Sequence, residues 1–277
     1  MSAYEQLMAF THTTQALGEV AGRLGWDQEA IMPAGAAPQR AEEMAAMESV
    51  LHARRIDPKV GEWLAAIDEA QLDEVGRAQV RHIRKSFERT SKVPADLAAE
   101  IAKVTSRAQG IWAQARSDED VAAFLPTLEE VVGLKRQEGQ ALAAGGDVYD
   151  AMVDDYEPEM TAEEIAAMFD AMRPRLVALR AAVLAAEAPQ KLTGTFAANK
   201  QMALTSKLAA SFGYDFDHGR IDCVTHPFCS GSGKDVRITT RTSESDPFNC
   251  FYSTIHEVGH AAYEQGIDDA YLLTPLG

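Results

Sequence analysis

Two histidines near the end of the chain, His256 and His260, are separated by three residues, and Glu257 directly follows the first of them. Residues four apart lie on one face of an α-helix, one turn above each other. Two imidazoles in that arrangement can bind a single tetrahedral metal ion as its first two protein ligands. The carboxylate of Glu257 can then reach a water on that ion and act as a general base. The pattern therefore predicts a metal-dependent hydrolytic site.

The residues around this motif indicate a helix over Pro247–Gln265. Asp246 is a suitable N-cap, the proline after it suits the first helical position, and Gly266 is a natural end. Apolar and small residues recur at helical spacing, and we expect them to pack inward. They are Phe248, Phe251, Tyr252, Ile255, Gly259, Ala262 and Tyr263. The alternative is a pair of partly buried histidines with ordinary hydrogen bonds, but Glu257 would then be a costly carboxylate with no evident partner.

The composition is typical of a globular protein. Of the 277 residues, 46% are hydrophobic and 25% are charged, so the chain can bury a sizeable core. A net charge of −16 argues against nucleic acid or an anionic membrane as the main partner. Three cysteines without a C-x-x-C spacing indicate free thiols in a reducing compartment. Neither a membrane span nor a secretion signal is visible, and we therefore expect a cytoplasmic protein.

Helical periodicity dominates most of the chain, so we predict a mainly α fold. The H-E-x-x-H motif then predicts a zincin-like metallopeptidase built of long helices, with a small β-sheet beside the metal-binding helix. We expect residues 1–190 to form a helical region and residues 191–277 the start of a catalytic region. The two are interpreted as one continuous domain. Tyr149–Pro158 is expected to be a loop between two long helices. The predicted helices before residue 213 are Tyr4–Leu24, Pro38–Arg54, Pro58–Gln71, Gly76–Thr90, Pro94–Arg116, Asp118–Ala143, Thr161–Ala186 and Ala197–Phe212.

Two short β-branched segments follow, Arg220–Thr225 and Asp235–Arg241, and we predict that they are strands of a small sheet. The glycine-containing segment Cys229–Lys234 is expected to be the turn that joins them. The second strand alternates apolar with polar side chains just before the metal-binding helix, so a peptide could pair with its edge. An ordinary half-buried strand is the alternative. His226 lies between the strands, on a segment stiffened by Pro227.

Three motifs in this order resemble the Taq-type zinc metallocarboxypeptidase family. They are His226-Pro-Phe228, Asp235-Val-Arg-Ile-Thr239 and His256-Glu-Val-Gly-His260. Four further segments look like that family, so the resemblance covers essentially the whole chain. These segments are Gly25–Pro33, Asp154–Pro158, Gly219–Asp222 and Ala262–Gly266.

The resemblance implies a cytosolic, mostly helical and often homodimeric enzyme that removes single residues from peptide C-termini with one zinc or cobalt ion per subunit. Carried over by motif, His256 and His260 are expected to be metal ligands and Glu257 the general base. The expected substrate-binding residues are His226, Asp235, Arg237 and Thr239. The expected partners are therefore peptides with a free C-terminus and a second copy of the chain.

The chain also departs from the family. The resemblance places the third zinc ligand, a glutamate, on a later helix, beyond Gly277. The sequence is therefore expected to be either the N-terminal portion of such an enzyme or a naturally shortened relative. Two other functions remain open: an oligopeptide-cleaving zincin endopeptidase, and an inactive helical relative that binds no metal.

Overall fold

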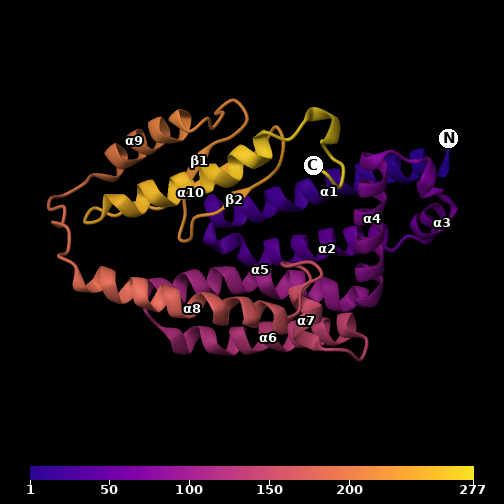
Figure 1. Ribbon diagram of the computed structural model, residues 1–277, viewed down its shortest axis with the longest axis horizontal. Helices are drawn as coiled ribbons and strands as arrows, with labels where there is room; N and C mark the ends of the chain where they lie inside the picture. Colours follow the sequence, from indigo (N-terminus) through magenta and orange to yellow (C-terminus); the bar gives the residue numbers. More distant parts are fainter.

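The computed structural model describes residues 1–277, and it confirms a mainly α fold. Nearly all regular structure is helical, and a single three-stranded sheet lies beside the last long helix (Figure 1). No helix combines the length and apolar character that crossing a bilayer would require. The helices are α1 (Ala3–Ala30), α2 (Ala37–Arg55), α3 (Pro58–Ala66), α4 (Glu74–Lys92), α5 (Ala95–Ser117), α6 (Val121–Ala143), α7 (Val148–Val153), α8 (Ala162–Ala185), α9 (Ala198–Ser211) and α10 (Pro247–Gln265).

The helices form two parts around α1 (Figure 1). On one side, α2 packs on α1, α5 packs on α2, and α6 packs on α5. On the other side, α9, α10 and the sheet form a second layer. The chain crosses from α8 to α9 through an irregular segment, residues 186–197, at the edge of the molecule (Figure 1).

The sheet has the strand order β1-β3-β2, with β1 at Ile221–Cys223, β2 at Cys229–Ser230 and β3 at Arg237–Thr240. The central strand β3 pairs in parallel with β1 and antiparallel with β2. The first and last of these strands lie within the predicted segments. The interpretation of Cys229–Lys234 as only a turn was wrong, because its first two residues form β2. Chain reversal occurs in the glycine-containing residues that follow.

Three helical predictions also differ from the structure. The predicted helix Pro58–Gln71 ends at Ala66, and Glu69–Gln71 forms a separate 3₁₀ turn. Helix α1 continues through Gly25 to Ala30, because Trp26 becomes a buried anchor instead of the start of a loop. Residues of the predicted loop Tyr149–Pro158 form the short helix α7. Its N-cap is Asp147, whose side chain accepts hydrogen bonds from two backbone N–H groups, a common way to start a helix.

Two separate apolar clusters stabilise the fold. One lies where α1, α3 and α4 meet and includes Leu7, Val60, Leu64, Val80 and Ile83. The other joins α9 and α10 to β3, and its buried members are Ala209, Tyr214, Val236, Ile238, Val258 and Ala261. The second cluster fixes α10 against the sheet, and this contact positions the histidine motif.

The predicted inward face of α10 was wrong. Phe248, Tyr252 and Tyr263 are exposed, whereas the buried face contains Cys250 and Val258 together with other small side chains. The reason is that α10 packs closely on β3. The narrow space between them has room for Cys, Thr and Ala side chains but not for large aromatic ones. The aromatic stripe is therefore on the outside of this helix.

Candidate metal centre

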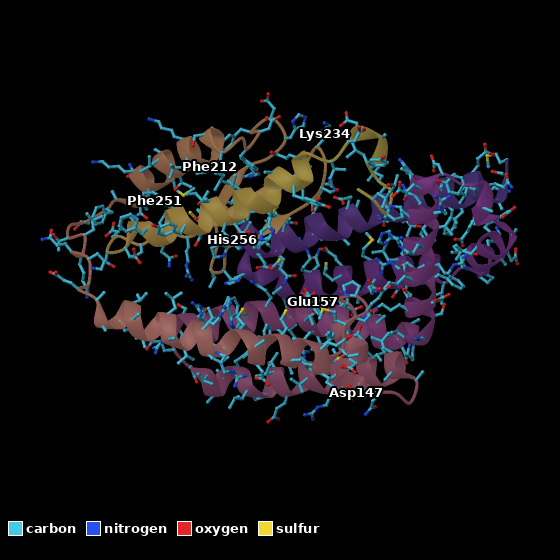
Figure 2. All side chains as sticks on the ribbon, viewed as in Figure 1. Asp147, Glu157, Phe212, Lys234, Phe251 and His256 are labelled. Carbon is cyan, nitrogen blue, oxygen red and sulfur yellow. The ribbon has the colours of Figure 1, made fainter.

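The two histidines of the motif face each other on the outer side of α10. Their Nε2 atoms are 3.2 Å apart, and the rings meet edge to face. Both side chains are exposed, whereas Glu257 on the adjoining face is only 6% exposed. Figure 2 labels His256 midway along α10 and Phe251 nearer to the start of that helix. The helix thus presents two imidazoles to solvent and holds the carboxylate beside them.

This pair fits two of the ligands of a tetrahedral ion. Two nitrogens bound to zinc at about 2.0–2.1 Å lie about 3.3 Å apart, close to the observed Nε2–Nε2 separation. Two neutral imidazole nitrogens at this distance need a proton or a cation between them, because two lone pairs would otherwise repel. No third His, Cys, Asp or Glu side chain of the structure joins them to form a complete ligand group. The residues present therefore fit part of a metal site.

An open cavity of about 500 Å³ surrounds the pair. The β2 segment and α10 form its walls, and its ten lining residues are His226, Pro227, Phe228, Cys229, Ser230, Gly231, His256, Glu257, His260 and Glu264. The structure thus brings His226 together with the H-E-x-x-H residues, as the sequence analysis expected for a shared groove.

Two other titratable side chains in this cavity have shifted pKa values. Burial raises the pKa of the Cys229 thiol to about 11, and the charges of Glu257 and Glu264 add to the effect. Burial likewise raises the pKa of Glu264, with a further contribution from Glu19 and a partly opposing one from His260. The cavity is therefore a place where negative charge is costly, and a bound cation would relieve that cost.

A buried network of hydroxyl and thiol groups fixes α10 on β3. The Thr254 hydroxyl donates to the Thr240 hydroxyl at 2.9 Å and also contacts the Cys250 carbonyl oxygen. The Cys250 thiol lies 3.2 Å from the hydroxyl of Thr205 on α9. All four side chains are fully buried. The network therefore fixes which face of α10 is turned toward β3, and it does so about one helical turn before Glu257.

Thr239, a predicted substrate-binding residue, is fully buried and holds the His226-Pro-Phe segment in place. Its hydroxyl accepts a hydrogen bond from the Phe228 backbone N–H at 2.7 Å and donates to the Phe228 carbonyl at 3.0 Å. Its backbone N–H donates to the same carbonyl. These contacts anchor the segment that carries His226 at the wall of the metal cavity.

Arg237 and Asp235 lie on the opposite side of β3, toward α1, and do not line the cavity. Arg237 donates two hydrogen bonds to Asp235 and its guanidinium lies 4.3 Å from the centre of the Trp26 ring. Arg220 contacts the same indole from 5.2 Å, and Arg23 of α1 also donates to Asp235. This cluster joins α1 to the sheet, and the substrate-binding role predicted for Arg237 and Asp235 stays a prediction.

The Asp235 cluster predicts a pH-dependent contribution to stability. Hydrogen bonds from Arg237 lower the pKa of Asp235, burial partly opposes the shift, and Arg23 adds to it. A carboxyl whose folded pKa is lowered stabilises the fold above its unfolded pKa of about 3.9, and this contribution is lost as the pH falls. We expect Asp235→Asn to reduce the free energy of unfolding by about 1 kcal/mol at pH 7, and the deficit to shrink toward pH 3. Urea unfolding at both pH values measures it, with Asp217→Asn at an exposed carboxylate as control. An equal deficit at both pH values would contradict the ionic origin.

Sequence analysis missed Cys229 as a lining residue of the cavity, whereas helical spacing alone places Glu264 one turn after His260 on the same face of α10. Cys229 was assigned to a turn, and its place at the site depends on the pairing of β2 with β3.

A second cavity of about 720 Å³, between α1, α2 and α5, was also not foreseen. Glu29 lines it, and burial raises the pKa of that side chain while His226 partly opposes the shift. No periodicity in the sequence would have found the place of Cys229 or the second cavity.

A helical scaffold whose long helix carries H-E-x-x-H beside a small sheet is typical of metal-dependent peptidases. The family model described as Carboxypeptidase Taq (M32) metallopeptidase matches residues 6–277, and the chain therefore belongs to this family. It is 35% identical to thermostable carboxypeptidase 1 of Thermus thermophilus over 100% of the chain and 58% of that relative. It is 28% identical to carboxypeptidase 1 of Bacillus subtilis, over 99% of the chain and 55% of the relative.

Solved structures of M32 carboxypeptidases have the same fold as this chain. The M32 carboxypeptidase from Deinococcus radiodurans R1 superimposes with a TM-score of 0.85 at 37% identity, over 99% of this chain and 56% of the other. The BsuCP crystal structure superimposes with a TM-score of 0.93 at 27% identity, again over 99% of this chain and 56% of the other. The chain thus has the fold of these enzymes across its matched part and spans little more than half the length of its relatives.

Proposed function

We propose that this polypeptide contributes the metal-binding helix and general base of a metal-dependent carboxypeptidase, which releases single residues from the C-termini of peptides. The observation that carries the proposal is the 3.2 Å approach of the His256 and His260 Nε2 atoms beside the buried Glu257 carboxylate. Membership of the M32 family supports it. The spacing suits zinc or cobalt, of which we propose one ion per subunit.

In this proposal His256 and His260 hold the ion, and the third ligand comes from residues outside this chain. When bound, the ion lowers the pKa of water and polarises the scissile carbonyl. Glu257 takes the proton from the attacking water and returns it to the leaving amine. Glu257 is only 6% exposed and lines the same cavity as the two histidines, which supports this role. The mechanism thus needs only one acid–base group from this chain.

We assign the wall of the cavity at His226 to substrate binding. His226 lines the same cavity as the two metal-binding histidines, and the Thr239–Phe228 contacts hold its segment rigid. Asp235 and Arg237 would then shape the groove indirectly, by fixing the sheet to α1. We further propose a cytoplasmic homodimer that acts on peptides and binds neither nucleic acid nor membrane, in keeping with the net charge of −16.

Zinc binding should depend on both histidines. We expect His256→Ala and His260→Ala each to weaken zinc binding by about 100-fold, because each removes one of two first ligands. Glu257→Gln should leave the affinity nearly unchanged. Titration against a chromophoric chelator measures the affinities, with His12→Ala, at an exposed histidine on α1, as the matched control. Unchanged affinity in His256→Ala would remove the metal-site assignment and favour the inactive helical relative.

Peptide end requirements separate the proposed exopeptidase from the alternative endopeptidase. We expect a zinc-loaded protein, in which this chain is joined to the region that supplies the third ligand, to release the last residue of an N-terminally blocked peptide with a free carboxylate. Amidation of that C-terminus should abolish release, because a carboxypeptidase must recognise the terminal carboxylate. Mass spectrometry of the products measures both reactions. Internal cleavage of the doubly blocked peptide would instead support the endopeptidase.

A further inference from the structure

Helix α8 presents an apolar face that no other element covers. None of its 24 residues is buried, and its main neighbour is the short helix α7. Large apolar side chains recur at helical spacing and have exposed fractions between 43% and 66%. We call this set the α8 face: Phe169, Met172, Leu176, Val177, Val183 and Leu184. An exposed contiguous set of this kind marks a contact surface in a folded protein.

A second apolar surface lies on the other part of the molecule. A cavity of about 500 Å³ opens between the start of α9 and the start of α10. We call it the α9–α10 groove, defined by Leu192, Phe196, Leu204, Phe248 and Phe251. The exposed ring of Phe248 stacks on Tyr252 with 6.1 Å between their centres. The segment of residues 186–197 runs between this groove and α8 (Figure 1), so a single partner that follows it could contact both.

The length of the relatives indicates what covers these surfaces. The chain has their fold, with TM-scores of 0.85 and 0.93, yet it spans only 55–58% of their length. Only 37 of its 277 residues are buried, which is few for a chain of this size. A second copy fits the α8 face less well, because a two-fold axis through it would bring Arg173 and Arg180 near their own copies.

We propose that the α8 face and the α9–α10 groove bind the polypeptide region that M32 relatives carry outside the part matched by this chain. That region would place apolar side chains on Leu176 and Phe248 and carboxylates beside the arginines of α8. The proposal rests on family membership and on these surfaces, so it does not require that the chain hydrolyses peptides.

Hydrogen exchange tests the proposal without an activity assay. The sample is a fusion in which the unmatched C-terminal region of the Thermus thermophilus relative follows Gly277, compared with the 277-residue chain alone. We expect amide exchange in α8 and at the start of α10 to slow by about tenfold or more in the fusion. Peptides from the outer face of α2 around Val50 should exchange at the same rate in both. Unchanged exchange in α8 of the folded fusion would overturn the proposal.

Two further measurements separate the competing occupants. Val177→Arg in the fusion should restore fast exchange in α8, whereas Val50→Arg, an equivalent change at another exposed valine, should not. The 277-residue chain is also measured alone by light scattering and exchange across a concentration series. Concentration-dependent protection of α8 in that sample would show that a second copy binds the face, and this result would also overturn the proposal.

Discussion

Glu257→Gln is expected to lower kcat for release of a C-terminal residue by about 10²–10⁴-fold, the usual contribution of a positioned general base. The amide has nearly the same size as the carboxylate, so the buried side chain can keep its place with 6% exposure. It cannot accept the proton of the attacking water. Because His256 and His260 are unchanged, zinc binding should persist. Steady-state hydrolysis of an N-blocked dipeptide by the metal-loaded fusion, with and without the substitution, measures the loss, and metal content is determined in the same samples.

The control for this experiment is Glu138→Gln. Glu138 is also a buried glutamate, but it lies on α6 and pairs with Arg89 and Lys135. Its loss should reduce the free energy of unfolding and leave kcat near the wild-type value at temperatures well below unfolding. Wild-type kcat in metal-loaded Glu257→Gln would contradict the assignment of the base. If the metal-loaded wild-type polypeptide has no turnover while the fusion does, the missing activity belongs to the absent region and not to Glu257.

The helical class and the shared face of His256 and His260 could be predicted from the sequence because both depend on local spacing. Helical periodicity spans long segments, and His256 and His260 must share a face wherever α10 packs. The short strand β2 could not be predicted in this way, because two residues have no detectable period and Cys229 acquires its place only by pairing with Ile238. The end of α1 was likewise set by tertiary contact, since Trp26 is buried under Arg220 and Arg237.

The orientation of α10 shows a different limit of sequence reasoning. Aromatic residues define its apolar stripe, and burial of that stripe is the natural prediction for a surface helix. In the structure, Thr254 and Cys250 face β3 because they satisfy one another's polar groups inside a narrow contact. Phe248 and Tyr252 remain outside, on a surface for which we propose a further polypeptide region. We therefore interpret an exposed apolar stripe on a helix as a surface to which another polypeptide region binds.

Gly231→Ala is expected to reduce the free energy of unfolding by about 3 kcal/mol, because two independent constraints require glycine there. Gly231 follows β2 and has a φ of +89°, in the left-handed region that disfavours a side chain. A Cβ atom at this position would lie 2.0 Å from the Asp235 carbonyl oxygen, which belongs to the backbone and cannot rotate away. The turn must therefore open to admit alanine. Thermal unfolding should show a decrease in Tm of about 6–12 °C.

The matched control is Gly22→Ala in the middle of α1. No heavy atom lies within 4 Å of a Cβ built there, and the backbone is helical, so alanine should stabilise the protein by about 0.5–1 kcal/mol. The same chemical change thus has opposite signs at the two positions. Gly231 also lines the metal cavity next to Cys229 and Ser230, so opening the turn should displace the cavity wall as well. A Gly231→Ala protein with wild-type Tm would show that the β2–β3 turn is not held closed, and the wall at His226 could then not be rigid.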